Sequence, residues 1–190
     1  MDGTIWGAPE RKFQAAEPDG EPGVTVVGGE EISGYASVFN RRDQGGDVVL
    51  PGAYADSLKA MSKAGRRVKM LWQHDPTQPI GIWDVVREDK TGLYVKGRLL
   101  PEVEKGREAA ALLEAGAIDG LSIGYRTVKA ERDGKGHRLL QELELWEVSL
   151  VTFPMLPEAR VAGKADSPEA ETWRDVAALL EEARARMGRA

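Results

Sequence analysis

The chain has 190 residues, of which 42% are hydrophobic, and it carries a formal net charge of −5 with no cysteine. That length allows one domain of ordinary size with tails, and the acidic balance gives no electrostatic reason to expect nucleic acid as a partner. The lack of cysteine excludes disulfides, thiolate nucleophiles and thiolate metal sites. No signal peptide and no apolar stretch of membrane-spanning length is visible, so we expect a soluble, intracellular protein.

The N-terminal segment is predicted to be a flexible tail over residues 1–29, because glycine and proline punctuate it and its apolar residues show no sustained period. Aromatic and β-branched residues predict the first strand at 32–39, so we expect ordered structure to begin near Ile32. After a polar loop and a short apolar run, apolar residues at helical spacing predict a helix from Pro51 to Gly65.

Strands dominate the middle of the chain. The predicted strand segments are 68–73, 80–86, 93–99, 118–130 and 139–153. One further helix is expected at 102–115, where Gly116 supplies a left-handed cap. We predict a mainly β domain of the α+β class over residues 30–162, folded as a barrel or strongly curved sheet with its helices outside.

The C-terminal segment, 163–190, is predicted to be a linker followed by an amphipathic helix. Ser167 is suited to cap the helix, and apolar residues such as Trp173 and Leu180 fall on one face. We expect this helix and the N-terminal tail to be dispensable for folding. The apolar face of the helix is expected to dock on a partner protein or to be removed by cleavage, and packing on its own domain is the alternative.

His74 and Ser122 are the first candidates for catalysis. His74 is one of two histidines in the chain and lies beside a predicted strand end. Histidine is the side chain best suited to exchange a proton near neutral pH, and a serine hydroxyl becomes a useful nucleophile only when such a base is within reach. If the two meet in the fold, the chain is a hydrolase that works through an acyl-enzyme. The alternative is an exposed histidine near a turn and a small strand residue between glycines.

The sequence around Ser122 also matches another motif. Residues 120–124 read Gly-Leu-Ser-Ile-Gly, the pattern of the nucleophile elbow in α/β-hydrolases. An elbow needs a strand before the serine and a helix after it, whereas here a helix precedes and a strand follows. That fold would also assign the acid and the base to Asp133 and His137, which are too close along the chain. We interpret the match as accidental and expect His137 to be a solvated turn residue.

Strand alternation over 139–153 separates two sets of side chains. Leu145 alternates with Glu144, so we expect the leucine to point inward and the glutamate to be solvated. Continuing the inward face places Glu147 and Ser149 on it. The acid at this position is therefore predicted to be buried.

A buried carboxylate is uncommon unless it is paired. His74 is a sensible partner for Glu147. The alternative is an ion pair between Glu147 and an arginine such as Arg98 or Arg126. The pattern of residues leaves both open.

Five motifs follow one another along the chain. They are Gly-Tyr-Ala-Ser-Val-Phe (34–39), Gly-Asp-Val-Val-Leu-Pro-Gly-Ala (46–53), Leu-Trp-Gln-His-Asp (71–75), Gly-Leu-Ser-Ile-Gly-Tyr (120–125) and Glu-Val-Ser-Leu-Val-Thr-Phe-Pro (147–154). Together they strongly resemble the prohead, or capsid-maturation, serine proteases of tailed bacteriophages. The resemblance covers about residues 31–162 and leaves out both tails. It implies a fold similar to that of the herpesvirus assemblins, a β-barrel ringed by helices.

The resemblance also implies roles for individual residues. By motif, His74 is the general base and Ser122 the nucleophile. Glu147 is our choice for the third member, because the herpesvirus relatives use a second histidine and His137 lies in the wrong kind of segment. The oxyanion of the reaction would need donors, for which backbone N–H groups or Arg126, the nearest arginine along the chain, are candidates. No metal and no cofactor are implied.

As a member of that family, the chain would be a serine endopeptidase inside the immature capsid, the prohead, in the cytoplasm of the bacterial host. Its substrates would be scaffold protein or the scaffold-like segment of the major capsid protein, and usually the enzyme itself. We expect neither nucleic acid nor a membrane as a partner, and a homodimer stays open. The alternative is a catalytically inactive capsid-assembly scaffold protein that keeps the barrel. The intact set of His74, Ser122 and Glu147 favours the enzyme.

Overall fold

The structure, a computed structural model, describes residues 24–27, 30–156, 159 and 161–162. These residues form a sheet of nine strands and two helices. The strands are β1 (Val24–Val27), β2 (Glu31–Val38), β3 (Asp47–Val49), β4 (Lys69–Trp72), β5 (Asp75–Glu88), β6 (Gly92–Leu99), β7 (Gly120–Arg132), β8 (Arg138–Val151) and β9 (Val161–Ala162). The helices are α1 (Ala55–Lys63) and α2 (Glu104–Glu114).

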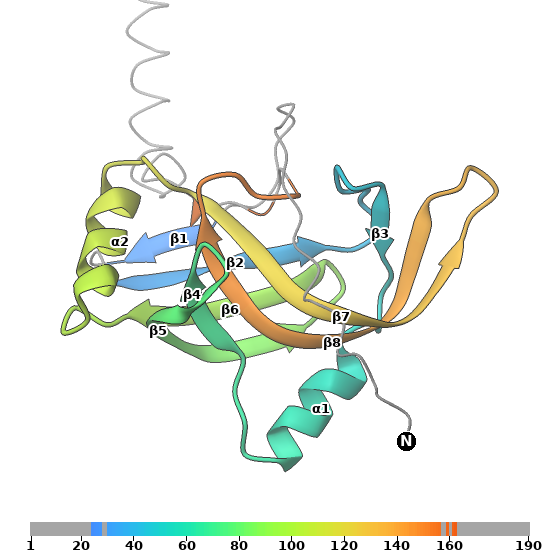
Figure 1. Ribbon diagram of the computed structural model, residues 1–190, viewed down its shortest axis with the longest axis horizontal. Coiled ribbons are helices and arrows are strands. Elements are labelled where there is room, and N and C mark those ends of the chain that lie inside the picture. The colour runs from blue at the N-terminus through green and yellow to red at the C-terminus, as the bar shows by residue number, and fades with distance from the viewer. Residues whose placement is uncertain (1–23, 28–29, 157–158, 160, 163–190) are drawn as a thin grey trace, which may run out of the picture.

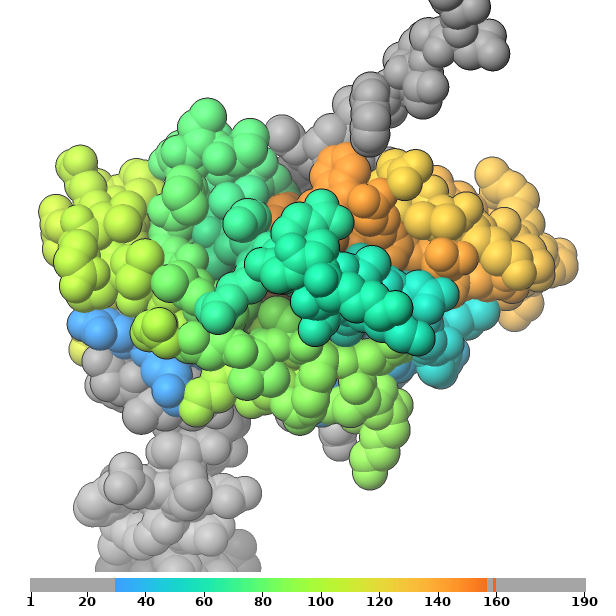
Figure 2. Space-filling model, turned by 90° about the horizontal axis from the view of Figure 1, so that it is seen from below, coloured from blue at the N-terminus to red at the C-terminus, as the bar shows by residue number. Residues whose placement is uncertain are grey.

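The sheet curls into a half-barrel, and both helices lie outside it (Figure 1). The strand order is β3-β8-β4-β5-β6-β2-β1-β9, and β7 pairs with β8 off this path. Seen from below, α1 lies across the middle of the molecule, with α2 at one end and the β7–β8 hairpin at the other (Figure 2). The predicted fold class, mainly β with helices outside a curved sheet, is confirmed.

Strand β8 connects three other strands of the sheet. It pairs with β7 over its whole length, and its other edge pairs in parallel with β3 and then with β4. Leu143, Leu145, Val148 and Leu150 on this strand are each exposed by 1% or less. Burying one such side chain stabilises the fold by roughly 1.5–3 kcal/mol. The strand is therefore held rigidly between β4 and β7.

The sheet begins earlier than the sequence pattern indicates. β1 lies within the segment predicted to be a tail, and it pairs antiparallel with β2 through Val26 and Ile32. Four residues next to glycines are too few to show the period of a strand, so the sequence pattern did not predict β1. Its stability comes instead from the hydrogen bonds that it makes to β2. The predicted C-terminal helix and residues 1–23 lie outside the described residues.

Strand β5 also begins earlier than its predicted start at Ile80, and it includes both prolines that were expected to bracket a turn. The β4–β5 ladder is irregular between Met70 and Trp72, which face the start of β5. Proline cannot donate to a ladder, so Pro76 and Pro79 are tolerated where the ladder is already interrupted. The chain reverses direction just before them instead, at Gln73 and His74.

Candidate active site

His74 lies in the tight turn between β4 and β5. Trp72 pairs with Asp75, so Gln73 and His74 form a two-residue hairpin loop. Their φ angles are +51° and +61°, a region that non-glycine residues rarely adopt. Positive φ at both central residues is the requirement of a type I′ hairpin turn. Such a conformation costs an ordinary residue roughly 1–2 kcal/mol, so other contacts must hold the turn in place.

Those contacts come from the end of β8. The Gln73 N–H donates to the Leu150 carbonyl at 2.9 Å, and the Gln73 side-chain amide donates to the Thr152 hydroxyl at 2.8 Å. The His74 N–H donates to the hydroxyl of Ser149 at 3.1 Å. The histidine backbone is therefore held at a defined position above β8.

The structure brings His74, Ser122 and Glu147 together in one hydrogen-bonded chain. His74 Nε2 is 2.8 Å from Ser122 Oγ, and His74 Nδ1 is 2.5 Å from Glu147 Oε1. The three residues are 5%, 5% and 8% exposed. With the proton on Nδ1, the imidazole donates to the carboxylate and its Nε2 accepts from the serine hydroxyl. This is the geometry in which a base activates a nucleophile while an acid orients the base.

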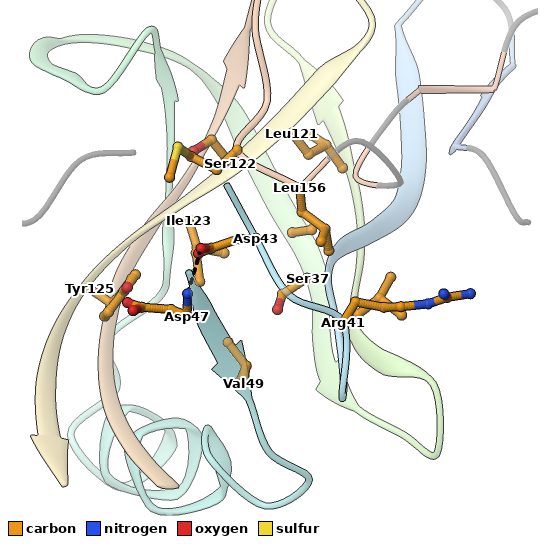
Figure 3. Close-up of a pocket in the computed structure, with 13 residues that line it drawn as sticks. Ser37, Arg41, Asp43, Asp47, Val49, Leu121, Ser122, Ile123, Tyr125 and Leu156 are labelled. Atoms are coloured by element: carbon orange, nitrogen blue, oxygen red, sulfur yellow. Dashed lines mark hydrogen bonds between the residues drawn. The ribbon is translucent and has the colours of Figure 1, made fainter. Parts of the chain in front are cut away.

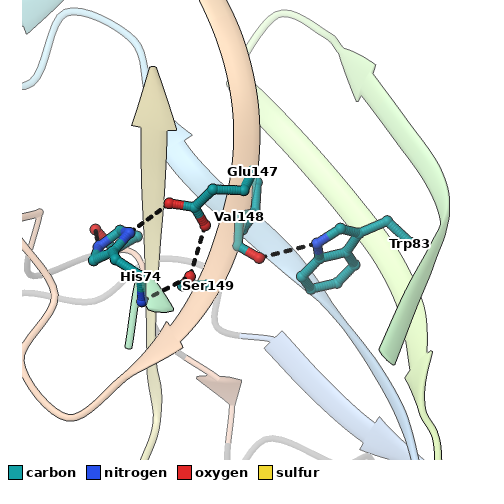
Figure 4. Close-up of polar contacts among 6 residues, drawn as sticks. His74, Trp83, Glu147, Val148 and Ser149 are labelled. Carbon is teal, nitrogen blue, oxygen red and sulfur yellow. Dashed lines mark hydrogen bonds and ion pairs between the residues drawn. The ribbon is translucent and has the colours of Figure 1, made fainter. Parts of the chain in front are cut away.

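Three adjacent strands supply these groups. On β7, Ser122 pairs with Ser149 of β8, and Gly124 pairs with Glu147. On the other edge of β8, β4 runs parallel and delivers the chain to the His74 turn. The indole N–H of Trp83 donates to the carbonyl of Val148 at 3.1 Å and anchors β8 between its two polar site residues (Figure 4).

A β-bulge in β8 puts Glu147 on the face of the sheet that carries Ser122. Paired residues of an antiparallel ladder point to the same side, so Glu147 lies on the side of Gly124. One residue further along β7, Tyr125 pairs with Leu145, so a register shift separates Leu145 from Glu147. The predicted burial of Glu147 is observed, but the premise that it shares the face of Leu145 is wrong. Uninterrupted alternation would have put the acid and the core leucine on one side.

Gly124 is a site residue that the sequence pattern did not single out. A Cβ on this glycine would lie 2.0 Å from Glu147 Oε1 and 2.7 Å from its carboxyl carbon. Only glycine leaves room for the carboxylate to reach His74 across β7. The second glycine of the Gly-Leu-Ser-Ile-Gly string was the available signal, since a glycine inside a strand often marks a close approach.

The alternative partners for Glu147 are engaged elsewhere. Arg98 forms an ion pair with Asp84, and Arg126 pairs with Glu144 at 2.7 Å with half of the arginine side chain exposed. Arg126 is therefore bound at the surface, and we do not assign it to the oxyanion.

The second histidine lies in the β7–β8 turn, as expected, although its side chain is half-buried rather than fully solvated. His137 Nδ1 is 2.8 Å from Asp133, and its Nε2 is 3.2 Å from Arg42. The Asp133 pKa is lowered, chiefly by the hydrogen bond from His137. The hydrogen bonds of the Asp133–His137 pair therefore do not involve Ser122, His74 or Glu147.

A small cavity of about 40 Å³ opens beside Ser122, between β7 and the strands β2 and β3 (Figure 3). Its walls combine apolar side chains such as Val49 and Leu156 with the acids Asp43 and Asp47. Among the described residues, no group of three or more histidines and acids is arranged to hold a metal ion. In the same part of the chain, neither helix has the length and apolar character needed to cross a membrane.

Comparisons with known proteins agree with one another. Residues 23–172 match the model of a family described as caudovirus prohead serine protease. The chain is 34% identical to the prohead protease of Enterobacteria phage HK97 over 163 residues, which is 83% of this chain and 67% of that protein. It is 31% identical to a capsid polyprotein of Pseudomonas phage PAJU2 over 102 residues, which is 50% of this chain and 15% of that protein. The bacteriophage T4 capsid assembly protease is similar in fold, with a TM-score of 0.55 and 16% identity over 64% of this chain and 80% of the other.

Proposed function

Because this chain belongs to the caudovirus prohead serine protease family, we propose that it is a serine endopeptidase whose catalytic residues are Ser122, His74 and Glu147. The observation that carries the proposal is the buried hydrogen-bonded chain from the Ser122 hydroxyl through the His74 ring to the Glu147 carboxylate. A scaffold protein without activity would have no need to bury an acid and a strained histidine turn around one serine.

The geometry supports an acyl-enzyme mechanism. Ser122 Oγ attacks the scissile carbonyl while its proton passes to His74 Nε2, and Glu147 stabilises the imidazolium that forms. When the tetrahedral intermediate collapses, the C–N bond breaks and His74 returns the proton to the leaving amine. A water molecule, deprotonated by His74 in turn, then cleaves the ester between Ser122 and the substrate. Burial of the pair strengthens these charge interactions, because little water screens them.

We infer that the substrates are scaffold protein or the scaffold-like segment of the major capsid protein, and the enzyme's own tails. Two relatives support a capsid partner, one named a prohead protease and one named a capsid polyprotein, part of which is similar to this chain. The reaction would then take place inside the prohead, within the bacterial host.

The test is co-expression of the chain with the major capsid protein of the same phage, followed by mass spectrometry of both proteins. We expect a capsid protein shortened at one junction with the wild-type chain and a full-length capsid protein with Ser122→Ala. A capsid protein that stays intact with the wild type would favour an assembly role without catalysis. Shortening that persists with a folded Ser122→Ala chain would refute Ser122 as the nucleophile.

A further inference from the structure

Ser149 is buried at the centre of the site, with 0% of its surface exposed. It stands on β8 opposite Ser122 of β7 and opposite Leu71 of β4. Its neighbours along the strand, Val148 and Leu150, point to the other face of the sheet, and its own face carries Ser122 and Glu147. A buried hydroxyl needs partners, and the identity of those partners indicates its role.

The partners of Ser149 are the base and the acid of the site. Its hydroxyl donates to Glu147 Oε2 at 2.6 Å and accepts the backbone N–H of His74 at 3.1 Å (Figure 4). Glu147 uses its other oxygen, Oε1, for the His74 ring. Both oxygens of the carboxylate are thus engaged, which sets the rotation of the carboxyl plane about its last bond.

The second bond acts on the histidine. His74 is in the left-handed backbone region, from which an ordinary residue tends to relax. The bond from its N–H to Ser149 helps to keep the backbone there, and with it the direction in which the ring leaves the turn. One hydroxyl therefore constrains the base through its main chain and the acid through its carboxylate.

We propose, on the basis of the function proposed above, that Ser149 is a positioning residue that aligns His74 and Glu147 for proton transfer from Ser122. The structure gives no hydrogen bond between Ser149 and the reacting hydroxyl of Ser122, so Ser149 acts through the other two groups. Its loss should slow the chemical step and leave binding unchanged, because a displaced base costs rate even when the pocket is intact.

The experiment measures how fast a fluorescent fluorophosphonate labels the full chain. Ser149→Ala should lower the maximal labelling rate roughly 10- to 100-fold, as expected for a lost hydrogen bond to a charged group. The half-saturating probe concentration should not change. Cysteine is close to serine in size, so Ser149→Cys should fold even if the void in Ser149→Ala prevents folding. Its labelling should be as slow as that of Ser149→Ala, because a thiol is a weak hydrogen-bond donor and acceptor. Ser149→Thr, which keeps the hydroxyl, should recover most of the rate.

Ser57→Ala is the matched control. Like Ser149, Ser57 accepts a backbone N–H through its hydroxyl, here that of Leu145 on β8 at 2.9 Å, but the structure gives it no hydrogen bond to His74 or Glu147. We expect this variant to label at the wild-type rate. An equal loss in Ser57→Ala would mean that removing any serine hydroxyl that bonds a backbone N–H around β8 slows the enzyme, and would overturn the proposal.

A double-mutant cycle separates positioning from general support of the fold. In a Glu147→Gln background, adding Ser149→Ala should cost clearly less than it does in the wild type, because the acid, one of the two groups through which Ser149 acts, is already impaired. Full additivity, or wild-type labelling in folded Ser149→Ala and Ser149→Cys, would refute the proposal. A wild-type chain that the probe does not label at Ser122 would instead refute the proposed function itself.

Discussion

Each of the two histidines in this chain is bonded through Nδ1 to a carboxylate, yet only one has a serine hydroxyl at its other ring nitrogen. At His74 the carboxylate is Glu147 and Nε2 accepts from a serine hydroxyl, while at His137 the carboxylate is Asp133 and Nε2 faces an arginine. The His74 side chain is 3% exposed and that of His137 is 26% exposed. The two histidine–carboxylate pairs therefore differ in what surrounds them. The group at the second nitrogen and the exclusion of water decide what the pair can do.

The largest expected effect is at the nucleophile. Ser122→Ala removes one oxygen from the His74 pair and little volume, so the fold should be kept while cleavage of the co-expressed capsid protein falls by roughly 10⁴-fold or more. Circular dichroism before the assay confirms the fold. Appreciable cleavage by a folded variant would move the nucleophile elsewhere.

The next effect concerns the acid. Glu147→Gln keeps the shape of the side chain but removes the charge that stabilises imidazolium, and we expect activity to fall roughly 10²-fold or more. Glu144→Gln is its control on the same strand. That residue forms a surface ion pair with Arg126, and its change should leave activity within about twofold. Both variants are assayed on the same capsid substrate. Strong loss at Glu144 with none at Glu147 would show that the third member is misassigned.

Two glycine-to-alanine variants test how precisely the Glu147 carboxylate must be positioned beside His74. In Gly124→Ala the new methyl group meets the Glu147 side chain from its Cγ to its carboxylate and no backbone atom, so the fold should survive while the carboxylate moves away from His74. A displacement of about 1 Å can cost up to 10²-fold in rate, and we expect a loss of roughly 10- to 100-fold. Gly134→Ala in the His137 turn meets open space and should behave as the wild type. Thermal unfolding and cleavage are measured for both. Equal activity of the two variants would mean that the site tolerates a shifted carboxylate.

The smallest effect is expected at the half-buried pair of Asp133 and His137. Because the folded state lowers the Asp133 pKa, its stabilising contribution is present above the usual carboxyl range, near about pH 4, and is lost as the pH falls through the lowered value. Asp133→Asn should remove this small pH-dependent contribution and leave cleavage at neutral pH unchanged. Urea unfolding midpoints at neutral and acidic pH, together with the cleavage assay, check both points. Reduced cleavage would give the turn a role in catalysis that its hydrogen bonds do not suggest.

Much of the site was predictable because the motif residues carry a chemistry that few other residues can supply. Ser122 with His74, the mainly β fold and the family resemblance all come from the residues of the chain, and the fold and the family are confirmed. The burial of Glu147 was also predicted, although from an alternation that the β8 bulge breaks. A bulge adds one residue to one strand only, so it is visible in the pairing and not in the period of a single segment.

The sequence by itself determined which groups are available: one serine between glycines, a histidine at a strand end, and an acid in an apolar run. Tertiary structure decided which of them meet. The positive φ angles at Gln73 and His74, the space left by Gly124 and the two bonds of Ser149 all depend on contacts between segments far apart in the chain. Local patterns report the period and polarity of one segment. The distance from a histidine to its acid is set by how three strands are placed in register, and that is decided only when the sheet closes around them.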